Sequence, residues 1–278
     1  NMSNQNHKIY LNDILSINET KRENYKIHFA TKVGEEPLDV YVADKNKWKR
    51  WNEHKDRGNR DIWSRKYIFS LIDFYPKNNE WLFGGIFEVL ENKEERYKIK
   101  LSSKYDNYIG RLLIHYNRNF RTRAVYLEKY YDDMIVSELF KKEYKGLTFP
   151  GFENINIKLR NLKSIINNRK NDWYTALKNK KGIYVIFDDN TGKKYVGSAY
   201  NNSGIWSRWS SYVNNGHGGN NNMKKVINKK GYDYALDNFY ISLLEHLPMN
   251  YDEKTVIERE NHWKNVLLSR GDYGYNEN

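Results

Sequence analysis

Short runs of β-branched and aromatic residues, separated by polar turns, characterise the first half of the chain. Runs of this kind predict β-strands. They occupy residues 39–44, 67–76, 81–91, 95–102, 108–117 and 123–130. Because the strands follow one another at intervals of roughly 10–15 residues without long helices between them, a small barrel or curled sheet is predicted. Residues 135–144, IVSELFKKEY, are expected to form a helix.

The second half alternates between helical and strand patterns. Residues 160–180 have apolar positions at helical spacing, and GIYVIFDDNTGKKYVGSAY at 182–200 has two apolar runs around a polar turn, which predicts a β-hairpin. The remaining predicted elements are a helix at 203–215 capped by Ser203, a helix at 223–230, a strand at 238–247 and a helix at 253–270 closed by Gly271.

A stretch of turn residues separates the two halves. Pro150 and Gly151 lie in GLTFPGFENINIKL, and we place the domain boundary near residue 150 on this basis. The sequence thus predicts a β-rich domain at 1–150, a connector with a helix at 151–180 and a second domain at 181–278. This combination of helices and strands places the chain in the α+β class.

The chain carries a basic surplus. Its 278 residues include 47 Lys and Arg against 35 Asp and Glu, which gives a net charge of +12. Such a surplus attracts polyanions, of which nucleic acid is the commonest, although a general richness in Lys and Asn is an alternative explanation. The absence of cysteine excludes disulfides and thiolate metal sites. Since no apolar run approaches the roughly 18 residues of a membrane helix, we expect a cytoplasmic protein that does not contact membranes.

Glu260 interrupts the apolar stripe of the last predicted helix. Its neighbours at helical spacing are Val256, Ile257 and Trp263. Burying an unpaired carboxylate is costly, so a cationic partner is expected. An ion pair with Lys264, four residues later, and a bound metal ion are equal alternatives on spacing alone.

Five elements of the second half resemble the GIY-YIG nuclease family in their order and spacing. They are GIY at 182–184, YVG at 195–197, a helix with Arg208, a helix with Glu260 and a late asparagine in GYNEN. The phrases GIWSRW, GHGGN and WKNVLLSRGDYGYNEN also resemble a bacterial branch related to restriction enzymes more than they resemble repair or intron-encoded members of the family. The resemblance implies a small antiparallel three-stranded sheet flanked by helices over residues 181–278.

The same resemblance implies a metal-dependent phosphodiesterase and assigns roles to matching positions. Tyr184, Tyr195, Arg208 and Asn276 correspond to catalytic residues of the family, with Asn278 a weaker match than Asn276. Glu260 corresponds to its single metal-binding carboxylate, which implies one Mg²⁺ or Mn²⁺ ion per site. Tyr212 and His217 fall where auxiliary residues occur, although a hydrogen bond within its own loop is favoured for His217.

These residue types suit phosphodiester hydrolysis. Mg²⁺ often keeps most of its waters, so one carboxylate is sufficient to hold it. Arg208 can pair with phosphate oxygens. We hypothesise that Tyr184 accepts the proton of the attacking water. Because a free phenol has a pKa near 10, this role requires help from Tyr195, Lys193 or Lys194. No small-molecule cofactor is expected.

The first half is expected to direct the nuclease to DNA. The stretch SLIDFYPKNNEWLFGGIFEV distantly resembles PUA-like barrels, which include readers of modified bases. The aromatic residues that would form a base-binding cage are Trp48, Trp51, Trp63, Trp81 and Phe83. For each of them, a place in the barrel core is the favoured alternative. The cations expected to contact phosphates are Lys47, Arg50, Arg57, Arg60, Arg111, Arg121 and Arg123.

Three functions remain open from the sequence. The leading one is a double-stranded-DNA endonuclease of restriction or phage-defence type with a separate recognition domain. A repair or mobile-element nuclease acting on branched or damaged DNA would use the same chemistry. A non-catalytic nucleic-acid-binding protein is the third alternative, although all five family positions carry the expected residues. Cutting both strands with one site favours a homodimer on DNA.

Overall fold

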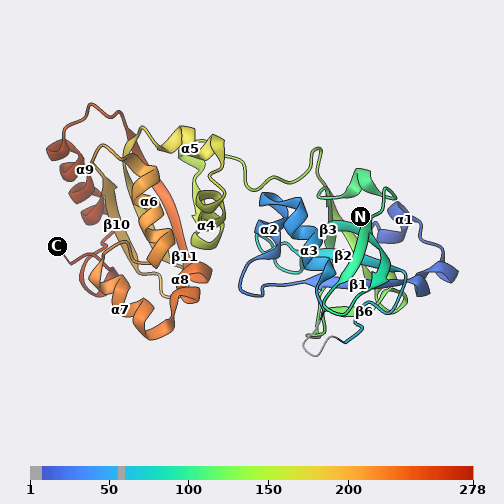
Figure 1. Cartoon of the computed structure of the whole chain (residues 1–278). Helices are drawn as coiled ribbons and strands as arrows, with labels where there is room; N and C mark the ends of the chain where they lie inside the picture. The colour runs from blue at the N-terminus through green and yellow to red at the C-terminus, as the bar shows by residue number, and fades with distance from the viewer. Residues whose placement is uncertain (1–7, 56–59, 278) are drawn as a thin grey trace, which may run out of the picture. The chain divides into compact units, whose positions relative to one another are not determined.

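The chain divides into two compact units, Asn1–Lys145 (unit 1) and Gly146–Asn278 (unit 2). The structure, a computed structural model, describes residues 8–55 and 60–277 (Figure 1). Each unit combines helices and strands. In the described part of the chain, no helix has both the length and the apolarity that crossing a bilayer requires.

A curled, half-barrel sheet forms the centre of unit 1 (Figure 1). Its strand order is β6-β1-β2-β3-β5-β7, and β4 pairs with the same edge of the long strand β3 as β5 does. The pair β1–β2 is parallel and the other pairs are antiparallel. The strands are β1 (Tyr25–Ala30), β2 (Tyr67–Asp73), β3 (Glu80–Asn92), β4 (Tyr97–Leu101), β5 (Leu112–His115), β6 (Ala124–Tyr126) and β7 (Ile135–Leu139).

Two predictions for unit 1 are wrong. Residues 39–44, expected as a strand, belong to the helix α2 (Pro37–Ala43), because Pro37 starts a helix that buries Leu38 and Tyr41 one turn apart. Residues 135–144, expected as a helix, contain the strand β7 instead, which pairs with β5 at the edge of the sheet. The other helices of unit 1 are α1 (Leu11–Leu15) and α3 (Lys45–Glu53).

Unit 2 contains a four-stranded antiparallel sheet in the order β10-β9-β11-β8. The predicted hairpin is formed by β9 (Lys181–Asp188) and β10 (Lys194–Ala199), and β11 (Phe239–Leu247) is the predicted third strand. The fourth strand, β8 (Asn156–Lys158), lies in the segment expected to be a connector and pairs with β11. This segment is therefore part of the unit 2 sheet.

Helices pack on both faces of this sheet. The larger core lies between the sheet and α4, α5, α6 and α8, and a smaller one lies between the hairpin and α9. The helices are α4 (Leu159–Asn167), α5 (Asn171–Leu177), α6 (Gly204–Asn215), α7 (Asn221–Lys230), α8 (Tyr232–Asn238) and α9 (Glu253–Val266). Short 3₁₀ turns lie at Glu19–Asn24, Asp106–Tyr108, Leu127–Lys129, Tyr131–Asp133, Phe152–Asn154 and Gly271–Tyr273.

Two helix boundaries differ from the prediction. The hydroxyl of Ser203 donates to Asn201 Oδ1 at 2.6 Å and makes no capping bond to α6. The last helix ends at Val266, before the expected Gly271, because Leu268 adopts a left-handed φ of 51° that stops the helical repeat.

Candidate active site

Two phenols lie on one face of the β9–β10 hairpin. Tyr184 is directly opposite Gly197, and Tyr195 precedes Gly197 by two residues. Because side chains two residues apart share a face of a strand, Tyr184 and Tyr195 are diagonal neighbours. A Cβ on Gly197 would lie 2.6 Å from Tyr184 Oη and 2.8 Å from Tyr195 Cε1. Glycine at this position therefore leaves room for both rings.

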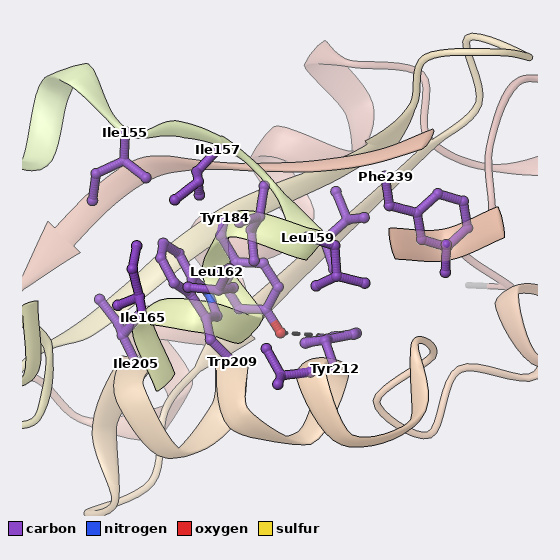
Figure 2. Close-up of a cluster of buried hydrophobic side chains, with 14 of the residues drawn as sticks. Ile155, Ile157, Leu159, Leu162, Ile165, Tyr184, Ile205, Trp209, Tyr212 and Phe239 are labelled. Carbon is purple, nitrogen blue, oxygen red and sulfur yellow. Dashed lines mark hydrogen bonds between the residues drawn. The ribbon is translucent and has the colours of Figure 1, made fainter. Parts of the chain in front are cut away.

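Arg208 reaches the hairpin from α6. Its Nε donates to Tyr184 Oη and its Nη2 donates to Tyr212 Oη, both at 3.0 Å. The two phenol oxygens are also hydrogen-bonded to each other at 2.9 Å. Figure 2 shows Tyr184 pointing towards α6, with this bond to Tyr212 and with Trp209 beside it. We call Tyr184, Arg208 and Tyr212 the phenol–guanidinium cluster.

The electrostatics of this cluster keep both phenols neutral. Burial raises the pKa of Tyr184 and of Tyr212, the nearby Tyr195 phenol raises both further, and Arg208 only partly offsets the effect. Burial lowers the pKa of Arg208, but the surrounding phenols raise it more, so the guanidinium remains charged. The cluster thus carries one positive charge. The fully buried, protonated Tyr184 is poorly suited to accept a proton from water in this arrangement.

The loop after α6 holds the remaining nitrogen of Arg208. Arg208 Nη1 donates to the carbonyl of Gly218 at 2.9 Å. Asn215 Oδ1 accepts the backbone N–H groups of His217 and Gly218 at 3.0 and 2.7 Å, which fixes the turn. The side chain of His217 accepts the N–H of Gly219 at 3.0 Å and thus makes a hydrogen bond within its own loop.

Glu260 meets the hairpin on the opposite face. There α9 packs through Val256 against Val196 and its neighbours. Ser198, two residues after Val196, donates a hydrogen bond to Glu260 Oε2. Lys264 Nζ lies 2.8 Å from Glu260 Oε1, so the ion pair expected as one alternative is formed. The Glu260 side chain nevertheless retains 17% exposure.

Asn276 attaches the C-terminal tail to the edge strand β10. Its Nδ2 donates to the carbonyl of Val196 and its Oδ1 accepts the Val196 N–H, both at 2.8 Å. The N–H of Tyr275 donates to the carbonyl of Lys194 at 2.7 Å. Both polar atoms of the Asn276 carboxamide are therefore engaged with backbone. Within residues 8–55 and 60–277, the pairing of the tail with β10 ends at Val196, and residues 197–199 form an open edge of the sheet. Asn278, the weaker match, lies outside the described residues.

The two hairpin lysines are placed away from the phenols. Lys194 Nζ donates to the carbonyl of Gly192 at 3.1 Å. Lys193 lines a pocket of about 300 Å³ together with lysines of α7, among them Lys225 and Lys229. In the described part of the chain, neither lysine amine is hydrogen-bonded to Tyr184 or Tyr195.

The donor atoms around Glu260 fit a metal site with a single carboxylate. The described residues contain no group of three or more His, Cys, Asp or Glu side chains able to hold an ion together. Mg²⁺ is commonly held by one or two carboxylates and keeps several waters. Glu260, with Ser198 beside it, supplies such a donor set, provided that Lys264 gives up its contact.

Most of the proposed cage aromatics in unit 1 form its core. Trp48 and Trp63 are buried on one side of the sheet, and Trp81 and Phe83 on the other. They therefore cannot form one cage without unfolding the sheet, and the core role favoured for them is the one observed. Trp51 is half-buried and lines a surface pocket.

The proposed phosphate contacts of unit 1 are scattered. Lys47, Arg50 and Arg123 line the same pocket as Trp51. Arg111 instead donates to the carbonyls of Phe140 and Asn107. Arg60 is exposed and has an interaction partner. Arg121 is also exposed, and its backbone carbonyl accepts a hydrogen bond from Arg118. Arg57 lies outside the described residues.

The sequence analysis missed Ser198. Its only signal was the two-residue period of β10, which places Ser198 on the same face as Val196. The analysis also missed Asp188, a buried carboxylate that accepts hydrogen bonds from Tyr234 and Tyr275. Asp188 illustrates a polar core contact that no local pattern indicates.

Comparison with known proteins links part of the chain to a nuclease. No protein-family model matches the sequence. A curated relative, the intron-associated endonuclease 1 of Enterobacteria phage T4, is 35% identical over 97 residues, or 35% of this chain. The match covers 36% of the phage enzyme, so this chain spans about a third of the length of that relative.

Two solved structures are also similar in sequence. The catalytic domain of the homing endonuclease I-TevI is 34% identical, with 35% of this chain and 98% of that domain covered at a TM-score of 0.28. A mutant of the same catalytic domain is also 34% identical, covering 35% of this chain and 92% of that chain at a TM-score of 0.27. About a third of this chain is therefore homologous to the intron-associated endonuclease 1 of phage T4.

Proposed function

We propose that unit 2 is a metal-dependent endonuclease that hydrolyses phosphodiester bonds of DNA. The observation that carries this proposal is the phenol–guanidinium cluster on the hairpin, in a chain with 35% identity to an intron-associated endonuclease over 97 residues. The scissile phosphate would lie at the open edge of β10, beside Gly197 and Ser198. This edge is where the face with Arg208 and the face with Glu260 converge.

The side chains then divide the chemical work between the two faces. Arg208 binds the phosphate and stabilises the negative charge that develops as water attacks phosphorus. Tyr184 and Tyr212 hold the guanidinium in place. Tyr195 is only half-buried on the same face, so its hydroxyl is the phenol best placed to bind the attacking water.

Glu260 and Ser198 would hold one Mg²⁺ or Mn²⁺ ion on the other face. Such an ion supplies Lewis-acid stabilisation of the phosphate and the leaving oxygen. Asn276 keeps its place at the edge by bonding to Val196 and thereby shapes the end of the site.

We propose two biological contexts, namely restriction and defence, or repair and mobility of DNA. The intron-associated relative favours the second role, in which unit 1 directs the cut. The basic surplus of the chain supports double-stranded DNA as the partner in either case. A cutting assay with three substrates would separate these contexts. The possible outcomes are discrete fragments from an unmodified plasmid, fragments only from a plasmid with modified cytosine, and cutting only of branched DNA.

The central test compares two carboxylates of α9. The full chain is incubated with supercoiled plasmid and Mg²⁺, as wild type, as Glu260→Gln and as Glu258→Gln. Glu258 lies on the same helix, its side chain is 64% exposed and it pairs with Lys254, so it is a matched control. We expect wild type and Glu258→Gln to cut the plasmid and Glu260→Gln to lose cutting by at least about 100-fold. Equal cutting by all three proteins would refute the site, and no cutting of any substrate by wild type would favour a DNA-binding protein without activity.

A further inference from the structure

A pocket of about 330 Å³ opens on unit 1 beside α3. The helix supplies Lys47, Arg50 and Trp51 to its lining. These positions are separated by three and four residues, so they share one face of the helix. The opposite face carries Trp48 and Asn52, both buried. One face of α3 thus anchors the helix in the core while the other is presented to the pocket.

The charges around this pocket are mainly positive. Arg123 lines it from the segment that precedes β6, where its carbonyl accepts the N–H of Phe29 at 2.8 Å. Lys47 pairs with the lining residue Glu35 at 2.6 Å. Arg50 is exposed, and no ion pair of its guanidinium occurs among the described residues. Among the described residues that line the pocket, Lys47, Arg50 and Arg123 are cations and Glu35 is a carboxylate, which favours an anionic ligand.

Buried hydrogen bonds hold the wall of the pocket in place. Asn52 Oδ1 lies 2.8 Å from His28 Nδ1 and also accepts a hydrogen bond from Ser70. Asn52 Nδ2 donates to the carbonyl of Trp48 at 3.0 Å, and Trp48 Nε1 donates to the carbonyl of Gly84 at 3.0 Å. These contacts tie α3 to β1, β2 and β3. The pocket is therefore preformed, as small-ligand sites usually are.

We propose that this pocket binds one nucleotide, with the base against the indole of Trp51 and the phosphate between Arg50 and Arg123. An indole beside guanidinium groups matches the two halves of a nucleotide, because bases stack on aromatic rings and guanidinium forks pair with phosphate oxygens. The volume falls within the range of small-ligand pockets. The nucleotide can be free in solution or part of a DNA strand, and only the DNA source rests on the proposed nuclease function.

Binding to the full chain in EDTA, without cleavage, tests this proposal. The probes are deoxynucleoside monophosphates and inorganic phosphate by calorimetry, and labelled single-stranded and double-stranded 12-mers by fluorescence anisotropy. The variants are Arg50→Ala and Trp51→Leu. The control is Lys49→Ala, which removes the same charge from the same helix at a position that does not line the pocket.

We expect Arg50→Ala and Trp51→Leu to weaken nucleotide binding at least about tenfold. The control Lys49→Ala should change nucleotide binding less than about twofold. Inorganic phosphate alone should bind to the wild-type chain more weakly than a nucleotide. Monophosphate binding would identify a free nucleotide as ligand, whereas binding only of the 12-mers would identify a nucleotide within DNA. Equal losses in Arg50→Ala and Lys49→Ala, or equal affinity for phosphate and nucleotides, would overturn the proposal in favour of a merely basic surface.

A second measurement covers the case in which Trp51→Leu does not fold. A 12-mer containing 5-iododeoxycytidine is crosslinked to the wild-type chain by ultraviolet light, and the modified residue is located by mass spectrometry. A crosslink at Trp51 supports the pocket as a site for a nucleotide within DNA, and crosslinks only elsewhere contradict DNA as the source of that nucleotide. Plasmid cutting that depends on Glu260 is measured separately, so failure of the pocket is distinguishable from failure of the nuclease proposal.

Discussion

The hydroxyl of Ser198 on β10 donates a hydrogen bond to the carboxylate of Glu260 on α9. This bond joins an edge strand to the helix that covers it, and Lys264 holds the second carboxylate oxygen. The orientation of the Glu260 carboxylate thus depends on residues from two different elements. Several predictions concern this arrangement.

Ser198→Ala is expected to raise the Mg²⁺ concentration for half-maximal plasmid cutting by about 10–100-fold, because groups that orient metal ligands contribute this much to affinity. Ser198→Thr keeps the hydroxyl and should restore the wild-type requirement. A magnesium titration of plasmid nicking measures the effect. An unchanged requirement in Ser198→Ala would show that the hydroxyl does not orient a metal ligand.

Lys264→Met is expected to lower the Mg²⁺ concentration for half-maximal cutting by about two- to fivefold, since the ammonium group competes with the ion for Glu260 and partly exposed pairs are modest in strength. Lys254→Met is the control, because this lysine also lies on α9 and its side chain is 87% exposed. The same titration applies. A higher magnesium requirement in Lys264→Met alone would mean that Lys264 orients the carboxylate for the ion.

Arg208→Lys is expected to reduce the rate of cutting by about 100-fold or more, the typical effect of removing a group that stabilises transition-state charge. Lysine keeps the charge but cannot bond to Tyr184, Tyr212 and the Gly218 carbonyl at once. Single-turnover cleavage gives the rate, and anisotropy in EDTA gives DNA affinity. Loss of affinity with an unchanged rate would assign Arg208 to binding alone.

Gly197→Ala is expected to lower the free energy of unfolding by about 1–3 kcal/mol, the usual cost of overpacking. The added methyl group would meet the rings of both Tyr184 and Tyr195. Urea unfolding measures the change. A wild-type midpoint for Gly197→Ala would show that the two rings can separate freely.

The stability of unit 1 is expected to fall as the pH decreases from 6.5 to 4. Burial lowers the pKa of His28 from 6.5 to about 4. The unfolded chain therefore binds a proton in this range before the folded chain does, which favours unfolding by about 3 kcal/mol in total. Urea unfolding at pH 7, 5.5 and 4 should show a shallower pH dependence for His28→Leu than for wild type. Parallel curves for the two proteins would rule out this contribution.

Local pattern predicted the parts of the fold whose elements are long and regular. The hairpin was predictable because two apolar runs flank a polar turn, and β11 because nine strand residues follow one another. The three-residue strand β8 was not, because its pairing with β11 depends on residues more than eighty positions away. Residues 39–44 are rich in β-branched and aromatic side chains like a strand, yet burial of Leu38 and Tyr41 on one helical face outweighs that preference.

The site was predictable only where a motif marked it. The pair Arg208 and Tyr212 could be placed on one helical face from their spacing, and the structure brings both to Tyr184. The contact of Ser198 with Glu260 requires the packing of α9 onto β10, across 62 positions of sequence. Likewise, the separation of Trp48 from Trp81 by the sheet follows from the tertiary fold and not from either local sequence.

The attachment of Asn276 to Val196 also bears on self-association. Edge strands with free backbone groups invite pairing with another chain. Here the tail satisfies the outward-facing amide and carbonyl of Val196, much as an added strand would. While the tail is in place, a second copy cannot pair with β10 at Val196, which restricts strand addition on this edge to residues beyond Val196.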